Sequence, residues 1–120
     1  MSANWKPSED EIKTLERLAL SFDTFRLFRS TMPISYAQAF CEVAKKPGEA
    51  TVTEIAKALG IDQPSMSRNL LELGIRRRAG DEGLGLIEWV NDINDLRGKF
   101  YRPTDKGIQI VKNLTRLMKT

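Results

Sequence analysis

The most regular pattern of apolar and polar positions lies between Thr51 and Leu73, in the stretch TVTEIAKALGIDQPSMSRNLLEL. Its first part places apolar residues 55, 56 and 59 on one face of a short helix. Thr53 is the expected N-cap of this helix. Gly60 is its expected end, because glycine readily adopts the left-handed conformation in which many helices stop. The pattern therefore predicts a short helix followed by a tight turn.

The second part of this stretch predicts another helix, over residues 63–73, with two different faces. Asp62 can cap it, and Pro64 is tolerated in its first turn, where an amide hydrogen has no helical partner. Apolar residues recur at intervals of four and three and form the face expected to be buried, namely Met66, Leu70 and Leu73. The other face carries polar side chains, namely Gln63, Ser65, Ser67, Arg68 and Asn69.

Side chains of these polar types can donate to and accept from base edges and phosphates, so the second helix suits the major groove of DNA. The alternative is that the helical pair forms a solvated corner of an all-helical domain. We favour DNA binding over this alternative.

Long apolar stripes begin and end the chain. Ser8 and Glu11 form a capping box that predicts a helix over residues 8–30. Its apolar positions repeat at three and four, at Ile12, Leu15, Leu18, Ala19, Phe22, Phe25 and Phe28. Thr104 is the expected cap of a last helix, residues 104–118. The apolar face of this helix comprises Ile108, Val111, Leu114, Leu117 and Met118.

A domain of this size has too little core surface to cover two long apolar stripes. We therefore expect part of them to pack against a second copy of the chain, as in symmetric dimers. Burial within one chain is the alternative. The expected dimer interface comprises Ile12, Leu15, Phe22, Val111, Leu114 and Met118.

Ser35 and Gln38 form a second candidate capping box, which predicts a helix ending at Lys45. The following residues 50–52 predict a very short strand. The region 74–86 is rich in glycine around a run of three arginines, and we predict a frayed helix end followed by a loop.

Residues 87–90 and 100–102 are rich in bulky and aromatic side chains, which favour strands. Polar and glycine residues separate them, so together they predict a β-hairpin. Its tip carries Arg97 and Lys99, and cations on a thin hairpin can reach a phosphate backbone or a minor groove.

Composition narrows the class of protein. The chain has 120 residues, of which 41% are hydrophobic and 29% charged, as in a globular domain that needs no disulfide or metal. No apolar run approaches the roughly 20 residues of a membrane span, and the N-terminus lacks the apolar core of a secretory signal, so we expect no membrane partner and a cytoplasmic location. The net charge is only +3, so any nucleic-acid site must depend on local clusters of cations.

The residue inventory argues against an enzyme. The chain has no histidine and one cysteine, so it offers neither an imidazole base nor a zinc site, and we expect no cofactor. The glycines at 80, 83 and 85 are not followed by the Gly-Lys-Ser/Thr of a phosphate-binding loop. We therefore expect them to act as hinges in an ordinary loop. Cys41 lies among apolar residues and is expected to be a small buried side chain.

A helical pair, a wing and a closing helix resemble the winged helix-turn-helix of the MarR family, the multiple-antibiotic-resistance-type regulators. The segment TVTEIAKALGIDQPSMSR is similar to the family's T-x-x-E-L-A-x-x-L-G-x-S-x-x-x-x-S/T-R pattern, and GLIEWVND to its G-L-I-x-R entry into the wing. Asp95-Leu96-Arg97, followed by Thr104 and Gly107, resembles the D-x-R wing signature and the L-T-x-x-G helix start. Trp89 stands where the family often has a basic residue, and the chain is longer than the family pattern between Arg68 and Gly85.

The resemblance implies one mainly α domain over residues 1–120, with about five helices and a two- to three-stranded wing: residues 8–30 would dimerise, residues 35–103 would form the winged helix-turn-helix, and residues 104–118 the last helix. It implies that Ser65, Ser67 and Arg68 contact the major groove and Arg97 the minor groove, with Asp95 bracing that arginine. The full expected DNA surface comprises Gln63, Ser65, Ser67, Arg68, Asn69, Arg76, Arg77, Arg97 and Lys99.

The expected function is that of a dimeric, sequence-specific regulator of transcription bound to double-stranded DNA, with repression as the favoured role. The alternative is a winged domain that assembles with proteins, for example in a replication or phage complex, which Trp89 and the low net charge favour. Families of this type can also bind a small-molecule effector between the dimer helices and the DNA-binding lobes. The aromatic residues that could line such a space are Trp5, Phe22, Phe25 and Phe28, for which we favour core packing.

Overall fold

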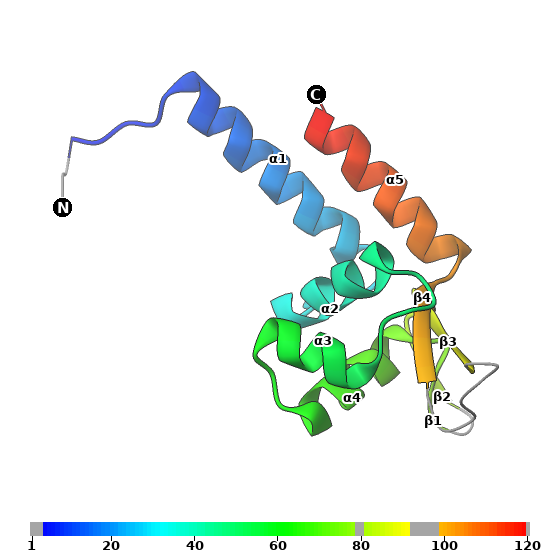
Figure 1. Ribbon diagram of the computed structural model, residues 1–120. Coiled ribbons are helices and arrows are strands. Elements are labelled where there is room, and N and C mark those ends of the chain that lie inside the picture. The colour runs from blue at the N-terminus through cyan, green and yellow to red at the C-terminus, as the bar shows by residue number, and fades with distance from the viewer. Residues whose placement is uncertain (1–3, 79–80, 92–98, 120) are drawn as a thin grey trace.

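A computed structural model describes residues 4–78, 81–91 and 99–119. These residues form five helices and two antiparallel two-stranded sheets (Figure 1). The predicted fold class, a mainly helical winged helix-turn-helix, is confirmed. The elements are α1 (Glu9–Arg26), α2 (Ile34–Lys45), α3 (Val52–Leu59), α4 (Gln63–Leu73), β1 (Arg76–Arg78), β2 (Asp81–Glu82), β3 (Ile87–Asn91), β4 (Lys99–Pro103) and α5 (Asp105–Lys119).

The two long helices, α1 and α5, pack against each other and project from the body formed by the other elements (Figure 1). The capping box predicted for α1 is confirmed, because the Glu11 N–H donates to Ser8 Oγ at 3.1 Å and the Ser8 N–H donates to Glu11 Oε1 at 2.8 Å. Thr104 also caps α5 as predicted, since its Oγ1 accepts from the Gly107 N–H at 3.2 Å. Helix α1 is shorter than expected, because it ends at Arg26.

The body is built around one apolar core to which α2, α4 and the start of β3 contribute fully buried side chains. Phe40, Met66, Leu70, Leu73 and Ile87 are all at most 1% exposed. Phe25, from the end of α1, meets Phe40 edge to face with ring centroids 5.8 Å apart, which joins the long helices to this core.

Helix α5 turns a different side to the body from the one that its apolar repeat predicted. Ile110, which lies outside that repeat, is buried, whereas Ile108 is exposed. Gly107 explains this orientation, because a Cβ there would collide with the Leu86 carbonyl oxygen and press on Phe40. The backbone of α5 therefore approaches the core at Gly107, and Ile110, one turn later, follows it inward.

Two predicted helix caps are wrong. Thr51, not Thr53, caps α3, with its Oγ1 accepting from the Glu54 N–H at 3.2 Å, because the helix starts at Val52 and Thr53 already lies in the first turn. The capping box at Ser35 does not form, because the N-cap of α2 is Pro33, two residues earlier, and Ser35 already lies in the first turn. The stop at Gly60 is confirmed, with a φ of 67° in the left-handed region.

The predicted wing is confirmed as β3 and β4, paired antiparallel with Trp89 opposite Tyr101 and Asn91 opposite Lys99. Of residues 50–52, only Ala50 takes part, through an isolated bridge to Tyr101, because α3 begins at Val52.

The region 74–86 differs from the predicted loop, since it contains a second hairpin, β1–β2. Backbone hydrogen bonds tie the return of this hairpin to the end of α4: Leu84 N–H donates to the Glu72 carbonyl at 2.9 Å and Gly85 N–H to the Gly74 carbonyl at 2.9 Å. A Cβ at Gly83 would collide with the Gly74 carbonyl oxygen, so this close approach requires glycine. Main-chain hydrogen bonds hold this hairpin in place. No periodic apolar pattern in the sequence predicts it.

In the described part of the chain, no helix combines the length and apolarity that crossing a membrane requires. The described residues also hold no group of three or more potential metal ligands among His, Cys, Asp and Glu.

Candidate nucleic-acid interface

Helix α4 has one buried face and one exposed face, as its sequence predicts. Asp62 fixes its start: Oδ2 accepts from the Ser65 N–H at 3.0 Å, and this bond, with help from the Ser65 hydroxyl, holds the pKa of Asp62 below its ordinary value. The inner residues enter the core. The outer stripe comprises Gln63, Pro64, Ser67, Arg68 and Leu71, all exposed.

The predicted polar residues of α4 do not all lie on that outer stripe. Arg68 is exposed and its Nη2 donates to Ser65 Oγ at 3.2 Å, so the half-buried Ser65 supports the guanidinium at the surface. Asn69 lies farther round the helix, where its Nδ2 donates to Ser35 Oγ on α2 at 3.3 Å. Asn69 thus joins α4 to α2, and the outward hydrogen-bonding groups are those of Gln63, Ser67 and Arg68.

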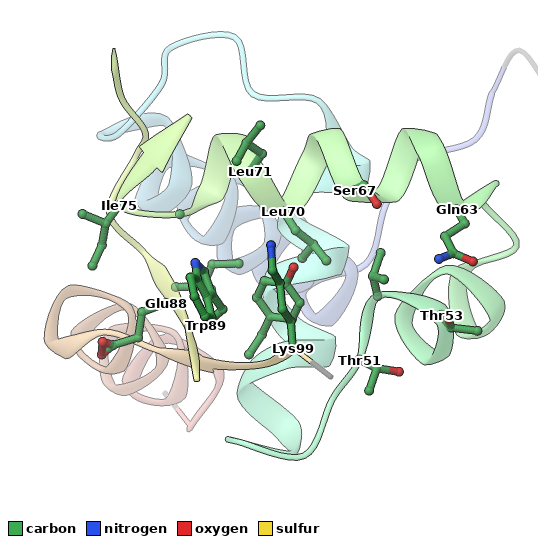
Figure 2. Close-up of a pocket in the computed structure, with 14 residues that line it drawn as sticks. Thr51, Thr53, Gln63, Ser67, Leu70, Leu71, Ile75, Glu88, Trp89 and Lys99 are labelled. Carbon is green, nitrogen blue, oxygen red and sulfur yellow. The ribbon is translucent and has the colours of Figure 1, made fainter. Parts of the chain in front are cut away.

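A groove of about 910 Å³ separates α4 from the wing. Figure 2 shows Gln63 and Ser67 from α4 on one side, Thr51 and Thr53 at the start of α3, and Trp89 and Lys99 from the wing. Neither threonine was predicted to lie in the site, because their position beside the groove depends on how α3 packs against the rest of the fold.

The wing supplies this groove with an aromatic ring and a cation. Trp89 is 53% exposed, and Lys99 Nζ lies 5.1 Å from the centroid of its indole ring. Glu88 also borders the groove, but its Oε1 lies 3.5 Å from Arg102 Nε, so its negative charge is partly balanced.

The remaining predicted cations follow α4 in the chain. Arg76 and Arg77 belong to β1, which packs against α4. For these two residues the structure describes the backbone and not the side chains. Asp95 and Arg97 lie outside the described residues, between β3 and β4.

The apolar stripes of the two long helices remain largely uncovered within one chain. Leu15 is 55% exposed, Phe22 41% and Met118 55%. Ile12 and Val111 are also exposed, whereas Leu114 is partly buried against the core.

The aromatic residues considered for an effector site divide into two groups. Core packing is confirmed for Phe25, which is buried, and for Phe28, which packs against the core, but is wrong for the exposed Trp5 and Phe22. Cys41 is also exposed, contrary to expectation, because it lies on the outer side of α2 beside Glu42 and away from Phe40 and Val43.

No protein-family model matches the sequence, and no curated protein matches it. Solved structures do. The chain is similar to the S. aureus MepR F27L mutant bound to an oligodeoxyribonucleotide, with a TM-score of 0.63 and 22% identity over 90% of this chain and 72% of that one. It is also similar to S. pneumoniae FabT in complex with DNA, with a TM-score of 0.61 and 20% identity over 92% and 73% of the two chains.

A third similar structure is a MarR family transcription regulator, with a TM-score of 0.60 and 22% identity over 92% of this chain and 66% of that one. The chain has the MarR-type fold. At these identities, 20–22%, the likeness concerns the fold alone. Within the MarR-type fold, α4 is the second helix of the helix-turn-helix and β3–β4 is the wing.

Proposed function

We propose that the protein is a sequence-specific regulator of transcription that binds double-stranded DNA as a dimer and acts as a repressor. The observation that carries this proposal is the outer stripe of α4, where Gln63, Ser67 and Arg68 present an amide, a hydroxyl and a guanidinium to solvent. These groups match the donors and acceptors on base edges in the major groove. The DNA-bound state of MepR and FabT, whose folds are similar, supports the same use of the fold here.

The wing supplies the second proposed contact. Residues between β3 and β4 include Arg97, which we assign to the minor groove, with Asp95 as its brace. Lys99 starts β4 on the groove side of the wing and is assigned to the phosphate backbone. Arg76 and Arg77, on the hairpin after α4, would add contacts to phosphates.

A dimer is proposed because the exposed apolar side chains of α1 and α5 gather on a pair of helices that project from the body. Patches of this kind commonly mark protein contacts. A twofold pair would present two α4 helices to two half-sites about one helical turn apart, which predicts a palindromic operator.

The test is selection of bound duplexes from a random pool, followed by titration of the enriched sequence. Arg68→Ala should weaken binding by about 1–3 kcal/mol and relax preference at one base pair if Arg68 contacts a base. Arg97→Ala should weaken binding to the same duplex. Lys112→Ala removes an exposed cation from α5 and serves as the control. If no sequence is enriched, or if both arginine variants bind every duplex as tightly as the wild type, the proposal is wrong.

A second candidate function is a protein-assembly module. Leu71, Ile75 and Trp89 are large apolar side chains exposed beside the groove, and such side chains favour a protein partner. Salt separates the two candidates. DNA affinity should fall steeply as salt rises, whereas an apolar protein contact should change little.

A further inference from the structure

The groove between α4 and the wing has a divided lining, in which the proposed contacts leave Thr53 and Trp89 without a role. One side offers polar groups from Thr53, Gln63 and Ser67. Within the part of the chain that the structure describes, these three side chains form no hydrogen bond with the protein. The other side offers the exposed indole of Trp89 and the ammonium of Lys99. The groove thus combines hydrogen-bond donors that suit an anion with the flat apolar surface of an indole ring.

The position of the groove determines which part of a duplex would meet it. With α4 in the major groove and the wing in the neighbouring minor groove, the two elements lie on either side of the sugar–phosphate strand that separates those grooves. This strand must then pass between α4 and the wing, where the groove of about 910 Å³ lies. The occupant is therefore a single strand of the same duplex, and this step depends on the proposed function.

We infer that this groove holds one sugar–phosphate strand, with Trp89 packed against a deoxyribose and Lys99 and Thr53 bonded to phosphate oxygens. Hydroxyl and ammonium donors suit phosphate oxygens, and the carbon-rich face of a deoxyribose suits an aromatic ring. Bound DNA would also cover the indole of Trp89, which is 53% exposed in the free protein.

Charge and register agree with this occupant. Trp89 and Tyr101 are cross-strand partners, so their rings share the face of the wing that carries Lys99 two residues earlier. Lys99 Nζ lies 5.1 Å from the centroid of the Trp89 ring. The cation and the flat apolar ring can therefore contact neighbouring parts of one nucleotide. Among the described residues that line the groove, one is acidic, Glu88, and it has Arg102 as a partner at 3.5 Å.

The intrinsic fluorescence of Trp89 provides the test. The chain has two tryptophans, Trp5 and Trp89, so the Trp5→Phe variant reports on Trp89 alone. We expect saturating operator duplex to change the emission of this variant at one duplex per dimer and to protect Trp89 from quenching by acrylamide. The matched Trp89→Phe variant, which reports on Trp5, should show no such protection.

Substitutions then separate the roles of the two wing residues. Trp89→Ala should weaken binding about tenfold while keeping the salt dependence of the wild type, as expected when an apolar side chain is removed. Lys99→Ala should reduce the slope of log K against log salt by about one, and Lys112→Ala should leave it unchanged.

Each outcome has a distinct meaning. If the Trp5→Phe protein binds the operator while Trp89 stays fully accessible to acrylamide, the groove is empty in the complex and the inference is overturned, although the proposed function stands. If neither the wild type nor this variant binds any duplex, the proposed function fails first. The fluorescence measurement keeps Trp89 in place, so it decides the question even if Trp89→Ala does not fold.

Discussion

At the scale of single residues, Asp62 fixes the point at which α4 begins, and with it the direction of the side chains on the first turn. Its carboxylate accepts from the Ser65 N–H, and Ser65 in turn accepts from Arg68. A short chain of hydrogen bonds therefore runs from the helix cap to the residue that we assign to a base pair. Changes at Asp62 should affect both stability and DNA recognition.

Asp62→Ala should destabilise the protein, and Asp62→Asn, which keeps an accepting oxygen, should recover much of the loss. The pKa of Asp62 is lower in the folded protein, so its stabilising contribution is present above the ordinary pKa of 3.8 and is lost as pH falls through the lower folded value. Thermal unfolding of the wild type and Asp62→Asn between neutral and acidic pH measures this. A difference between the two that does not change with pH would contradict the assignment.

Local sequence predicted several residue-scale features that depend on neighbours a few positions away, although it misplaced the caps of α2 and α3. Ser8, Gly60, Asp62 and Thr104 fall in this group, since a cap or a stop needs only its own turn. Asn69 does not, because its partner Ser35 is 34 residues away on α2. The exposure of Cys41 likewise depends on which side of α2 faces the core.

At the scale of elements, the β1–β2 hairpin is the part of the proposed DNA-facing region that the sequence pattern did not predict. Three consecutive arginines show no alternation of apolar and polar residues, which is the usual signal for a strand. Main-chain bonds to the end of α4 determine its fold instead. The helices and the wing were predictable because each carries a periodic pattern of apolar positions, whereas the groove between them arises from packing.

The arginine run of β1 adds three positive charges to a strand that packs against α4. Replacing Arg76, Arg77 and Arg78 together with alanine should weaken binding to all duplexes alike and lower the salt slope by about one for each phosphate that is no longer neutralised. The triple lysine variant keeps the charge and is the control. Salt titrations that give the same slope for the alanine and wild-type proteins would exclude the hairpin from the interface.

At the scale of the whole molecule, the net charge of +3 says little about function, since the excess of cations lies in the last 18 residues and α4 and the wing are balanced overall. The shape is more informative. The chain extends 58 Å along its longest axis, and its two long helices leave apolar side chains exposed away from the body that carries α4 and the wing. Recognition and dimerisation are therefore assigned to separate parts of the molecule and can be disrupted separately.

Charged substitutions on α1 should separate the dimer without altering α4. Leu15→Glu combined with Phe22→Glu puts two carboxylates, about two turns apart, into the exposed apolar stripe. Sedimentation velocity should show a monomer, whereas the control Lys13→Glu, which changes charge at an exposed position already polar in the wild type, should leave the dimer intact.

DNA binding by this monomer tests the link between the two parts. Two half-sites gain affinity when their readers are joined, by roughly 10²–10⁴-fold for linked modules. The monomeric variant should therefore bind an operator with two half-sites about 100-fold more weakly than the wild type, yet bind a duplex with one half-site as well as the wild type does. Equal losses on both duplexes would mean that the substitutions damage the body. Undiminished binding to the full operator by a proven monomer would mean that one chain suffices for recognition, and the exposed stripe would then need another partner.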